Sequence, residues 1–334
     1  MAASAERVAA TTSTLLEVDG LTTEIRRRSG WVKAVDGISF AVGRGEILGL
    51  VGESGCGKTM TALSLIRLLP DAARISGGRA LLGGQDLLSL ARGRMRQVRG
   101  REVSMVFQEP MTSLDPAFTI GHQIVETIRA HERIAMKAAR ARAAEMLARV
   151  GIPRPATRLD DYPHQFSGGM RQRVMLAIAL VLEPRLLIAD EPTTALDVTI
   201  QAQILELIAG LREEIGMSVI LITHNLGVVH EIADRVAVMY AGELVEVAPV
   251  REIFDDPRHP YTQGLLRSMP GLASRGRELP VIPGRVPELG QIPDACRFNP
   301  RCPNRIPRCV ESHPDLVRTE RDRELRCYNP TPFR

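Results

Sequence analysis

Eight residues, 52–59, carry the clearest chemistry in this chain of 334 residues. They read Gly-Glu-Ser-Gly-Cys-Gly-Lys-Thr and fit the phosphate-binding pattern G-x-x-x-x-G-K-[ST] at every fixed position. Lys58 is expected to reach the β- and γ-phosphates of a nucleotide, and Thr59 is expected to hold Mg²⁺. The glycines let successive backbone N–H groups face one phosphate. The residues expected to bind phosphate are Gly52, Ser54, Gly55, Gly57, Lys58 and Thr59.

Two adjacent carboxylates, Asp190 and Glu191, follow the apolar run of residues 186–189. A buried parallel strand would carry them to its carboxyl end, where open sheets of this kind bind ligands. There Asp190 is expected to bind Mg²⁺ together with Thr59, and Glu191 is expected to activate the attacking water as a general base. The pair therefore predicts hydrolysis of the bound triphosphate.

Four further residues, at two places in the sequence, fit the same site. Ser167, Gly168 and Gly169 precede an apolar helical run, and a hydroxyl and two glycines at a helix start can bind an anion. His224 follows another strand-like run, so it is expected at the same sheet edge as Glu191.

The elements that must position these residues alternate along the chain. Apolar strand-like runs at 47–51, 103–107, 186–189, 219–223 and 236–240 are separated by helical stretches, which indicates a parallel sheet covered on both faces. A helical pattern runs from 121 to 150, and another helix follows Gly169 to Leu182. Strand-like runs near the start, 15–42, and at 79–82 complete an α/β nucleotide-binding core split by a helical insert.

Composition sets wide bounds. The net charge of +4 does not by itself argue for nucleic acid, and no nucleic-acid partner is predicted. No apolar run approaches the roughly 20 residues that cross a bilayer, and the start of the chain lacks the apolar stretch of a signal peptide. Residues 1–14 are interpreted as a disordered lead-in. Any link to a membrane is therefore expected to come through partner subunits.

In their order and context, these motifs resemble the ATP-binding cassette (ABC) family over residues 15–250. Residues 52–59 are similar to its Walker A loop, Phe166–Met170 to its signature motif and Leu186–Glu191 to Walker B. Gln108 corresponds to the Q-loop glutamine, Asp197 to the D-loop aspartate and His224 to the switch histidine. Met170 and Phe166 depart from the commonest signature residues, glutamine and leucine. Ile25 occupies the position of the adenine-stacking aromatic, with Trp31 nearby as an alternative.

The resemblance implies an ATPase with a P-loop (RecA-like) core, an antiparallel β subdomain and a helical insert. It also implies that ATP and Mg²⁺ lie between the Walker A loop of one subunit and the signature loop of another. The resemblance implies that Glu191, His224 and Gln108 are the catalytic residues, and that Gln108 joins Thr59 and Asp190 at Mg²⁺. Ser167, Gly168, Gly169 and Asp197 contribute to the nucleotide site.

Two segments resemble one group within the family, the ATPases of dipeptide, oligopeptide and nickel permeases. These are Gln108–Pro116 and the His259-Pro260-Tyr261-Thr262 run with Leu265, Leu266 and Pro270. The group implies two transmembrane permease subunits, an extracytoplasmic substrate-binding protein and a second ATPase subunit, identical or not. It also implies a peripheral position on the cytoplasmic face of a bacterial inner membrane.

Four of the five cysteines crowd into the tail with the spacing C-x5-C-x6-C-x17-C. Four thiolates suffice for an iron–sulfur cluster or for Zn²⁺. The tail resembles that of some peptide-permease ATPases that bind a [4Fe–4S] cluster, so this cluster is expected, with Zn²⁺ or no metal as the alternatives. The expected ligands are Cys296, Cys302, Cys309 and Cys327.

The expected organisation is therefore an ABC nucleotide-binding domain over residues 15–256, with its helical subdomain at about 109–180, and a small Cys-rich extension over 257–334. The expected function is to energise peptide uptake by ATP hydrolysis. Three alternatives stay open: import of nickel or another small solute, a soluble ABC ATPase that acts on DNA or ribosomes, and an iron–sulfur redox protein.

Overall fold

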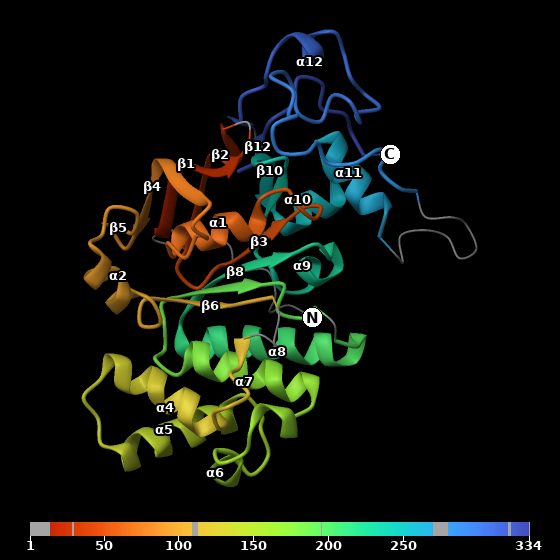
Figure 1. Ribbon diagram of the computed structural model, residues 1–334. Helices are drawn as coiled ribbons and strands as arrows, with labels where there is room; N and C mark the ends of the chain where they lie inside the picture. The colour runs from red at the N-terminus through yellow and green to blue at the C-terminus, as the bar shows by residue number, and fades with distance from the viewer. Residues whose placement is uncertain are drawn as a thin grey trace.

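The computed structural model describes residues 14–28, 30–108, 113–194, 196–269, 280–319 and 322–333. Its centre is an eight-stranded sheet in the order β11-β12-β10-β9-β3-β8-β7-β6 (Figure 1). Five neighbouring strands of this sheet run parallel. They are β9 (Arg235–Tyr240), β3 (Ile47–Val51), β8 (Ser218–Thr223), β7 (Leu186–Asp190) and β6 (Val103–Val106). The predicted parallel sheet is confirmed, and all residues of β3, β7 and β8 are buried.

A second, antiparallel sheet covers one face of the first. Its order is β2-β1-β4-β5, formed by β1 (Thr14–Arg27), β2 (Gly30–Gly43), β4 (Ala73–Leu82) and β5 (Gln85–Asp86). Apolar side chains of both sheets form one core with those of helix α1 (Lys58–Leu65). Leu16 and Val18 of β1 belong to it together with Leu48 of β3 and Leu65 of α1. Because α1 is held in this core, the loop that precedes it has a rigid base.

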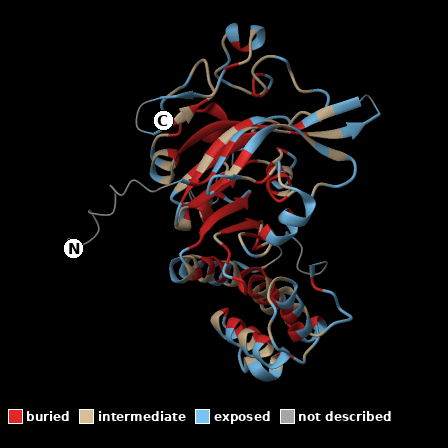
Figure 2. Cartoon of the chain, turned by 90° about the vertical axis from the view of Figure 1, so that its left-hand side faces the viewer, coloured by how far each residue is buried: buried red, intermediate tan, exposed pale blue. Residues whose placement is uncertain are grey.

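Helices cover the opposite face and extend away from it (Figure 1). The long helix α8 (Val198–Ile215) and α9 (Leu226–Ile232) share a core with the sheet, and α7 (Gly168–Leu180) connects that core to a helical subdomain. The subdomain also contains α4 (Ile120–His131), α5 (Met136–Arg149), the short α6 (Pro155–Arg158) and the 3₁₀ turn η1 (Pro163–Gln165). Figure 2 shows buried residues concentrated in the central sheet and in the inner helix faces.

The prediction of one helical run over residues 121–150 is wrong in one respect, because the segment forms two helices, α4 and α5. Glu132 at the end of α4 has extended backbone dihedrals, and the chain turns before α5. The turn brings Ile128 of α4 and Ala143 of α5 into the same core. Helix-forming residue types fill the turn, so local propensity gave no signal and packing decided the break.

The C-terminal region continues the main sheet. Strand β10 (Glu243–Pro249) pairs antiparallel with β9 on one side and with β12 (Glu324–Leu325) on the other, and β12 pairs with β11 (Val317–Arg318). Helices α10 (Val250–Asp255), α11 (Pro260–Arg267) and α12 (Arg308–Glu311) lie in the same region, and α2 (Arg92–Val98) precedes β6. The tail is therefore joined to the nucleotide-binding core through β12, which pairs with β10.

Candidate active site

The predicted phosphate loop connects β3 to α1, as its pattern requires. Gly57 has φ +112°, and a Cβ there would lie 2.7 Å from the carbonyl oxygen of Ala34, so only glycine fits. Lys58 is buried, and its Nζ donates to the carbonyl oxygens of Gly52 at 2.7 Å and Glu53 at 3.0 Å. The ammonium group is thus held above its own loop, in the position where it can meet a phosphate.

Helix α1 starts at Lys58 without a side-chain hydrogen bond from its N-cap residue, Gly57. The first N–H groups of a helix otherwise need a partner, and they attract anions. By contrast, Ser167 caps α7 and Asp197 caps α8 through their side-chain oxygens. Among these three helix starts, α1 is the one whose geometry leaves room for a phosphate to serve as the cap.

Strand β7 carries Asp190 to its tip, beside the loop. Asp190 is buried, and its Oδ1 has no hydrogen-bond partner among the described residues, while Thr59 donates to the same carboxylate. Burial raises the pKa of Asp190, the charge of Glu191 raises it further, and Thr59 and Lys58 oppose both effects. An unpartnered buried carboxylate oxygen beside a threonine hydroxyl fits Mg²⁺, a hard cation that takes oxygen ligands.

Glu191 follows Asp190 and faces three side-chain donors. Its Oε1 lies 3.1 Å from Nδ1 of His224, and its Oε2 accepts from Gln108 at 3.2 Å and from Thr194 at 2.9 Å. Glu191 has φ +47°, a left-handed conformation that is uncommon outside glycine and typical of functional sites. The structure thus brings together Gln108, Glu191 and His224, the three residues expected to be catalytic, and adds Thr194.

The net pKa of Glu191 is lowered. Burial alone raises it, but the hydrogen bonds from His224 and Thr194 and the positive charges nearby outweigh burial. The carboxylate is therefore ionised at neutral pH, as a general base must be, and donors on both oxygens fix its orientation.

The signature residues Ser167, Gly168 and Gly169 lie at the start of α7, apart from the phosphate loop at the start of α1. Ser167 Oγ accepts from the backbone N–H of Met170, and a Cβ on Gly169 would lie 2.8 Å from Cγ2 of Ile200 in α8. No hydrogen bond found between described residues joins positions 167–169 to the phosphate loop. Within one chain, the two predicted halves of the nucleotide site are therefore not brought together by hydrogen bonding.

A family comparison decides the class of protein. Residues 35–194 match the family described as "ABC transporter", and residues 245–309 match "Oligopeptide/dipeptide transporter, C-terminal region". A "Putative peptide import ATP-binding protein" of Brucella abortus is 53% identical over 92% of this chain and 93% of its own length. The chain belongs to the ABC transporter family. It is an ABC-type ATPase, and ATP is its nucleotide.

A further relative and two solved structures are also similar to this chain. The "Dipeptide transport ATP-binding protein DppD" of Bacillus subtilis is 49% identical over 94% of both chains. The structure of cbiO1 from Clostridium perfringens, described as part of an ABC transporter complex, has a TM-score of 0.62 at 27% identity, covering 72% of this chain and 90% of that one. The dimeric ATP-binding cassette MJ0796 with ADP and Pi has a TM-score of 0.63 at 24% identity, covering 71% of this chain and 99% of that one, and shows the fold.

Sequence reasoning missed several contacts of this ABC ATPase. Thr194 had no motif to mark it, although its place three residues after Glu191 puts it within reach. Trp31 is packed beneath the Arg74 guanidinium, 4.1 Å from the ring centroid, and is 40% exposed. Ile25 pairs with Val32 inside β1 and β2. Stacking of adenine on either residue stays a prediction.

Some predicted segments lie outside the described residues. These are the lead-in up to residue 13, residues 109–112 of the Q-loop extension, Ala195 of the D-loop and Pro270. Among the described residues, no helix combines the length and apolar character that crossing a bilayer requires.

The predicted [4Fe–4S] cluster is not supported. Among the described residues, which include all four tail cysteines, no group of three or more His, Cys, Asp or Glu side chains is arranged to hold a metal ion. Burial raises the pKa of Cys302 to about 11 and of Cys327 to about 12, and the other tail cysteines add to it. The same finding applies to Zn²⁺.

Proposed function

We propose that this ABC ATPase energises the import of peptides through separate membrane subunits, with an extracytoplasmic binding protein delivering the substrate. The observation that supports it is the combination of two matches in one chain, the ABC region at 35–194 and the oligopeptide/dipeptide C-terminal region at 245–309. Relatives at about half identity over almost the whole chain carry peptide or dipeptide import in their names. A soluble DNA or ribosome ATPase has no such support.

We propose that ATP binds between two protomers. The phosphate loop, Thr59 and Asp190 of one protomer hold the triphosphate and Mg²⁺, and Ser167, Gly168 and Gly169 of the other approach from the opposite side. The uncapped start of α1 and the separate placement of the signature residues support this arrangement. A second helix N-terminus adds positive potential when the protomers close, and Glu191 then orients the attacking water.

A mixed-protomer experiment tests the shared site. One protomer carries Glu191→Gln and the other carries Ser167→Arg, so that one of the two composite sites holds both changes and the other holds neither. We expect about half of the wild-type ATPase rate, while both changes in the same protomer damage both composite sites and give almost none. Equal rates for the two arrangements would contradict ATP binding at a shared interface.

The Q-loop supports the link to the membrane subunits. Gln108 touches Glu191 at one end, and the segment that follows leads to α4 of the helical subdomain. We propose that this segment and the helical subdomain contact the membrane subunits on the cytoplasmic face of the membrane. In vesicles that contain the complete importer, Gln108→Ala is expected to reduce peptide uptake more than ATP hydrolysis. Unchanged uptake per ATP would contradict this coupling role.

We include ATP and Mg²⁺ in this function and leave the [4Fe–4S] cluster out, since the described residues show no group of three or more side chains that supports it. Iron and acid-labile sulfide are measured in the chain purified without oxygen. We expect neither above background, and stoichiometric iron with sulfide would reverse the exclusion.

A further inference from the structure

Two side chains of the C-terminal region meet at one residue of the phosphate loop, Glu53. We propose that Tyr261 and Arg301 are positioning residues that hold this loop ready for the triphosphate. The two residues lie 208 and 248 positions along the chain from Glu53, outside the segment that matches the ABC family. This role concerns nucleotide binding by the ATPase, so it does not depend on the transported solute.

Tyr261 reaches the loop backbone. Its hydroxyl oxygen accepts the N–H of Glu53 at 2.9 Å, and its side chain is fully buried. The ring packs on the rings of Tyr240, at 4.7 Å between centroids, and Phe298, at 5.4 Å. These aromatic contacts fix the position of the hydroxyl, so the bond restricts where the backbone at Glu53 can lie.

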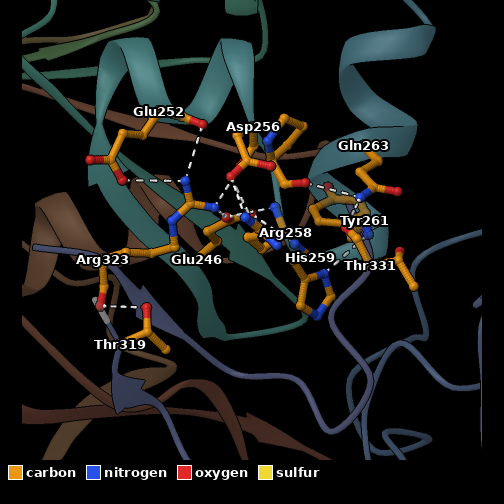
Figure 3. A network of polar contacts seen from close by, with 11 residues as sticks. Glu246, Glu252, Asp256, Arg258, His259, Tyr261, Gln263, Thr319, Arg323 and Thr331 are labelled. Atoms are coloured by element: carbon orange, nitrogen blue, oxygen red, sulfur yellow. Dashed lines mark hydrogen bonds and ion pairs between the residues drawn. The ribbon is translucent and has the colours of Figure 1, made fainter. Parts of the chain in front are cut away.

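The start of α11 sets the direction of Tyr261. His259 is the N-cap, and its Nδ1 accepts the backbone N–H of Tyr261 at 3.0 Å. The backbone N–H of His259 in turn donates to the buried carboxylate of Glu246 at 3.0 Å, as the network in Figure 3 shows. Arg323 of the tail pairs with the same carboxylate at 2.9 Å. The contact with Glu246 of β10 therefore fixes the position of His259, and His259 fixes the start of the helix that carries Tyr261.

Arg301 reaches the side chain of the same loop residue. Its guanidinium donates to both carboxylate oxygens of Glu53, at 2.6 and 3.0 Å, and its own side chain is 4% exposed. Nε donates to the carbonyl oxygen of Pro283 at 2.8 Å, which holds the stem of Arg301 in place. A forked ion pair made by a buried guanidinium gives orientation as well as attraction.

Glu53 also contacts Lys58, the lysine expected to bind the phosphates. Its carbonyl oxygen accepts from Nζ of Lys58 at 3.0 Å and from the backbone N–H of Cys56 at 3.3 Å. A shift of Glu53 would therefore move both the loop backbone and the lysine that meets the phosphates. Since catalytic and binding groups lose efficiency when misplaced by about 1 Å, this contact is expected to affect nucleotide affinity.

The test measures binding of a fluorescent ATP analogue with Mg²⁺ to the full chain. Tyr261→Phe removes the hydroxyl that holds the backbone of Glu53, and Arg301→Met removes the ion pair. Each is expected to raise the Kd by about tenfold, and Arg301→Lys, which keeps the charge but loses the fork, is expected to fall between wild type and Arg301→Met. Glu53 is 31% exposed, so it can be solvated when Arg301 is replaced.

Matched controls come from the same tail. Tyr328→Phe removes a hydroxyl that donates to the carbonyl oxygen of His313, and Arg308→Met removes a guanidinium that lies 4.1 Å from the centroid of the Tyr328 ring. Neither touches the phosphate loop. Melting temperatures are recorded for all variants, so that a general loss of stability is separated from a loss of nucleotide affinity.

A double variant gives the sharpest outcome. If Arg301 acts through Glu53, Arg301→Met is expected to have little further effect on the Kd in a Glu53→Gln background. The inference is overturned if the controls raise the Kd as much as Tyr261→Phe and Arg301→Met do. It is also overturned if those two variants bind the analogue as wild type does.

Discussion

The Nδ1 atom of His224 lies 3.1 Å from Oε1 of Glu191, although 33 residues separate the two in the sequence. Gln108 donates to the other carboxylate oxygen from a third strand end. The tips of β6, β7 and β8, neighbours in the parallel sheet, therefore supply one cluster. This arrangement makes the role of each residue testable by separate changes.

Glu191→Gln is expected to lower kcat for ATP hydrolysis by about 10²- to 10⁴-fold, because an amide cannot accept the proton of the attacking water. The Kd for ATP with Mg²⁺ should stay close to wild type, since Gln keeps the shape and can still meet its neighbours. Phosphate release and equilibrium binding measure the two effects. A kcat reduced less than tenfold would exclude Glu191 as the general base.

His224→Ala is expected to shift the pH profile of ATP hydrolysis. The hydrogen bond from His224 helps to lower the pKa of Glu191, so its loss raises that pKa. Because a base is active when deprotonated, the acidic decline of kcat should move to higher pH. The control is His230→Ala, an exposed α9 histidine that packs edge-on against Phe254. An identical profile in the two variants would contradict the contact.

Asp190→Asn is expected to remove the gain in ATP affinity that Mg²⁺ provides, because the orphaned carboxylate oxygen is the proposed cation ligand. Binding is measured with Mg²⁺ and with a chelator. Asp160→Asn, which changes an exposed partner of Arg140, serves as the charge-matched control. If Asp190→Asn retains the full Mg²⁺ effect, the cation is held elsewhere.

The buried imidazole of His259 is expected to make stability depend on pH. Burial lowers its pKa from 6.5 to about 3, so the unfolded chain binds a proton that the folded chain refuses. Stability is then complete above pH 6.5 and falls as the pH drops toward 3, by up to about 1.4 kcal/mol per pH unit from this group. His259→Asn, which can still cap α11, should show a smaller fall between pH 6.5 and 4.5. Urea unfolding at several pH values measures this, and equal slopes would argue against it.

The sequence predicted the parts of this molecule that local chemistry constrains. The phosphate loop, the Asp190–Glu191 pair and His224 each sit where a strand ends, and apolar strand runs are readable from composition. The contacts of Tyr261 and Arg301 with Glu53 could not be predicted, because no sequence periodicity connects residues more than 200 positions apart. The His-Pro-Tyr run was recognised as a signature, but its purpose needed the position of its neighbours in space.

The C-terminal tail was harder to predict than the core, because its helices and strands are short. Its cysteine spacing predicted a metal site, and the described residues show no group of three or more His, Cys, Asp or Glu side chains that supports it. Spacing along the chain does not by itself fix the directions of side chains in a region of short elements. Strand β10 was also missed, since it is buried in a region that was read as the end of the domain.

Strand β12 lies along β10 and hides its free backbone groups, and Arg323 neutralises the buried Glu246 at the same place. A chain cut before residue 257 would expose an unpaired strand flank and an uncompensated carboxylate together, and such flanks invite sheet-to-sheet aggregation. Anyone who builds chimaeric transporters from this protein should therefore transplant the cassette and its tail as one piece.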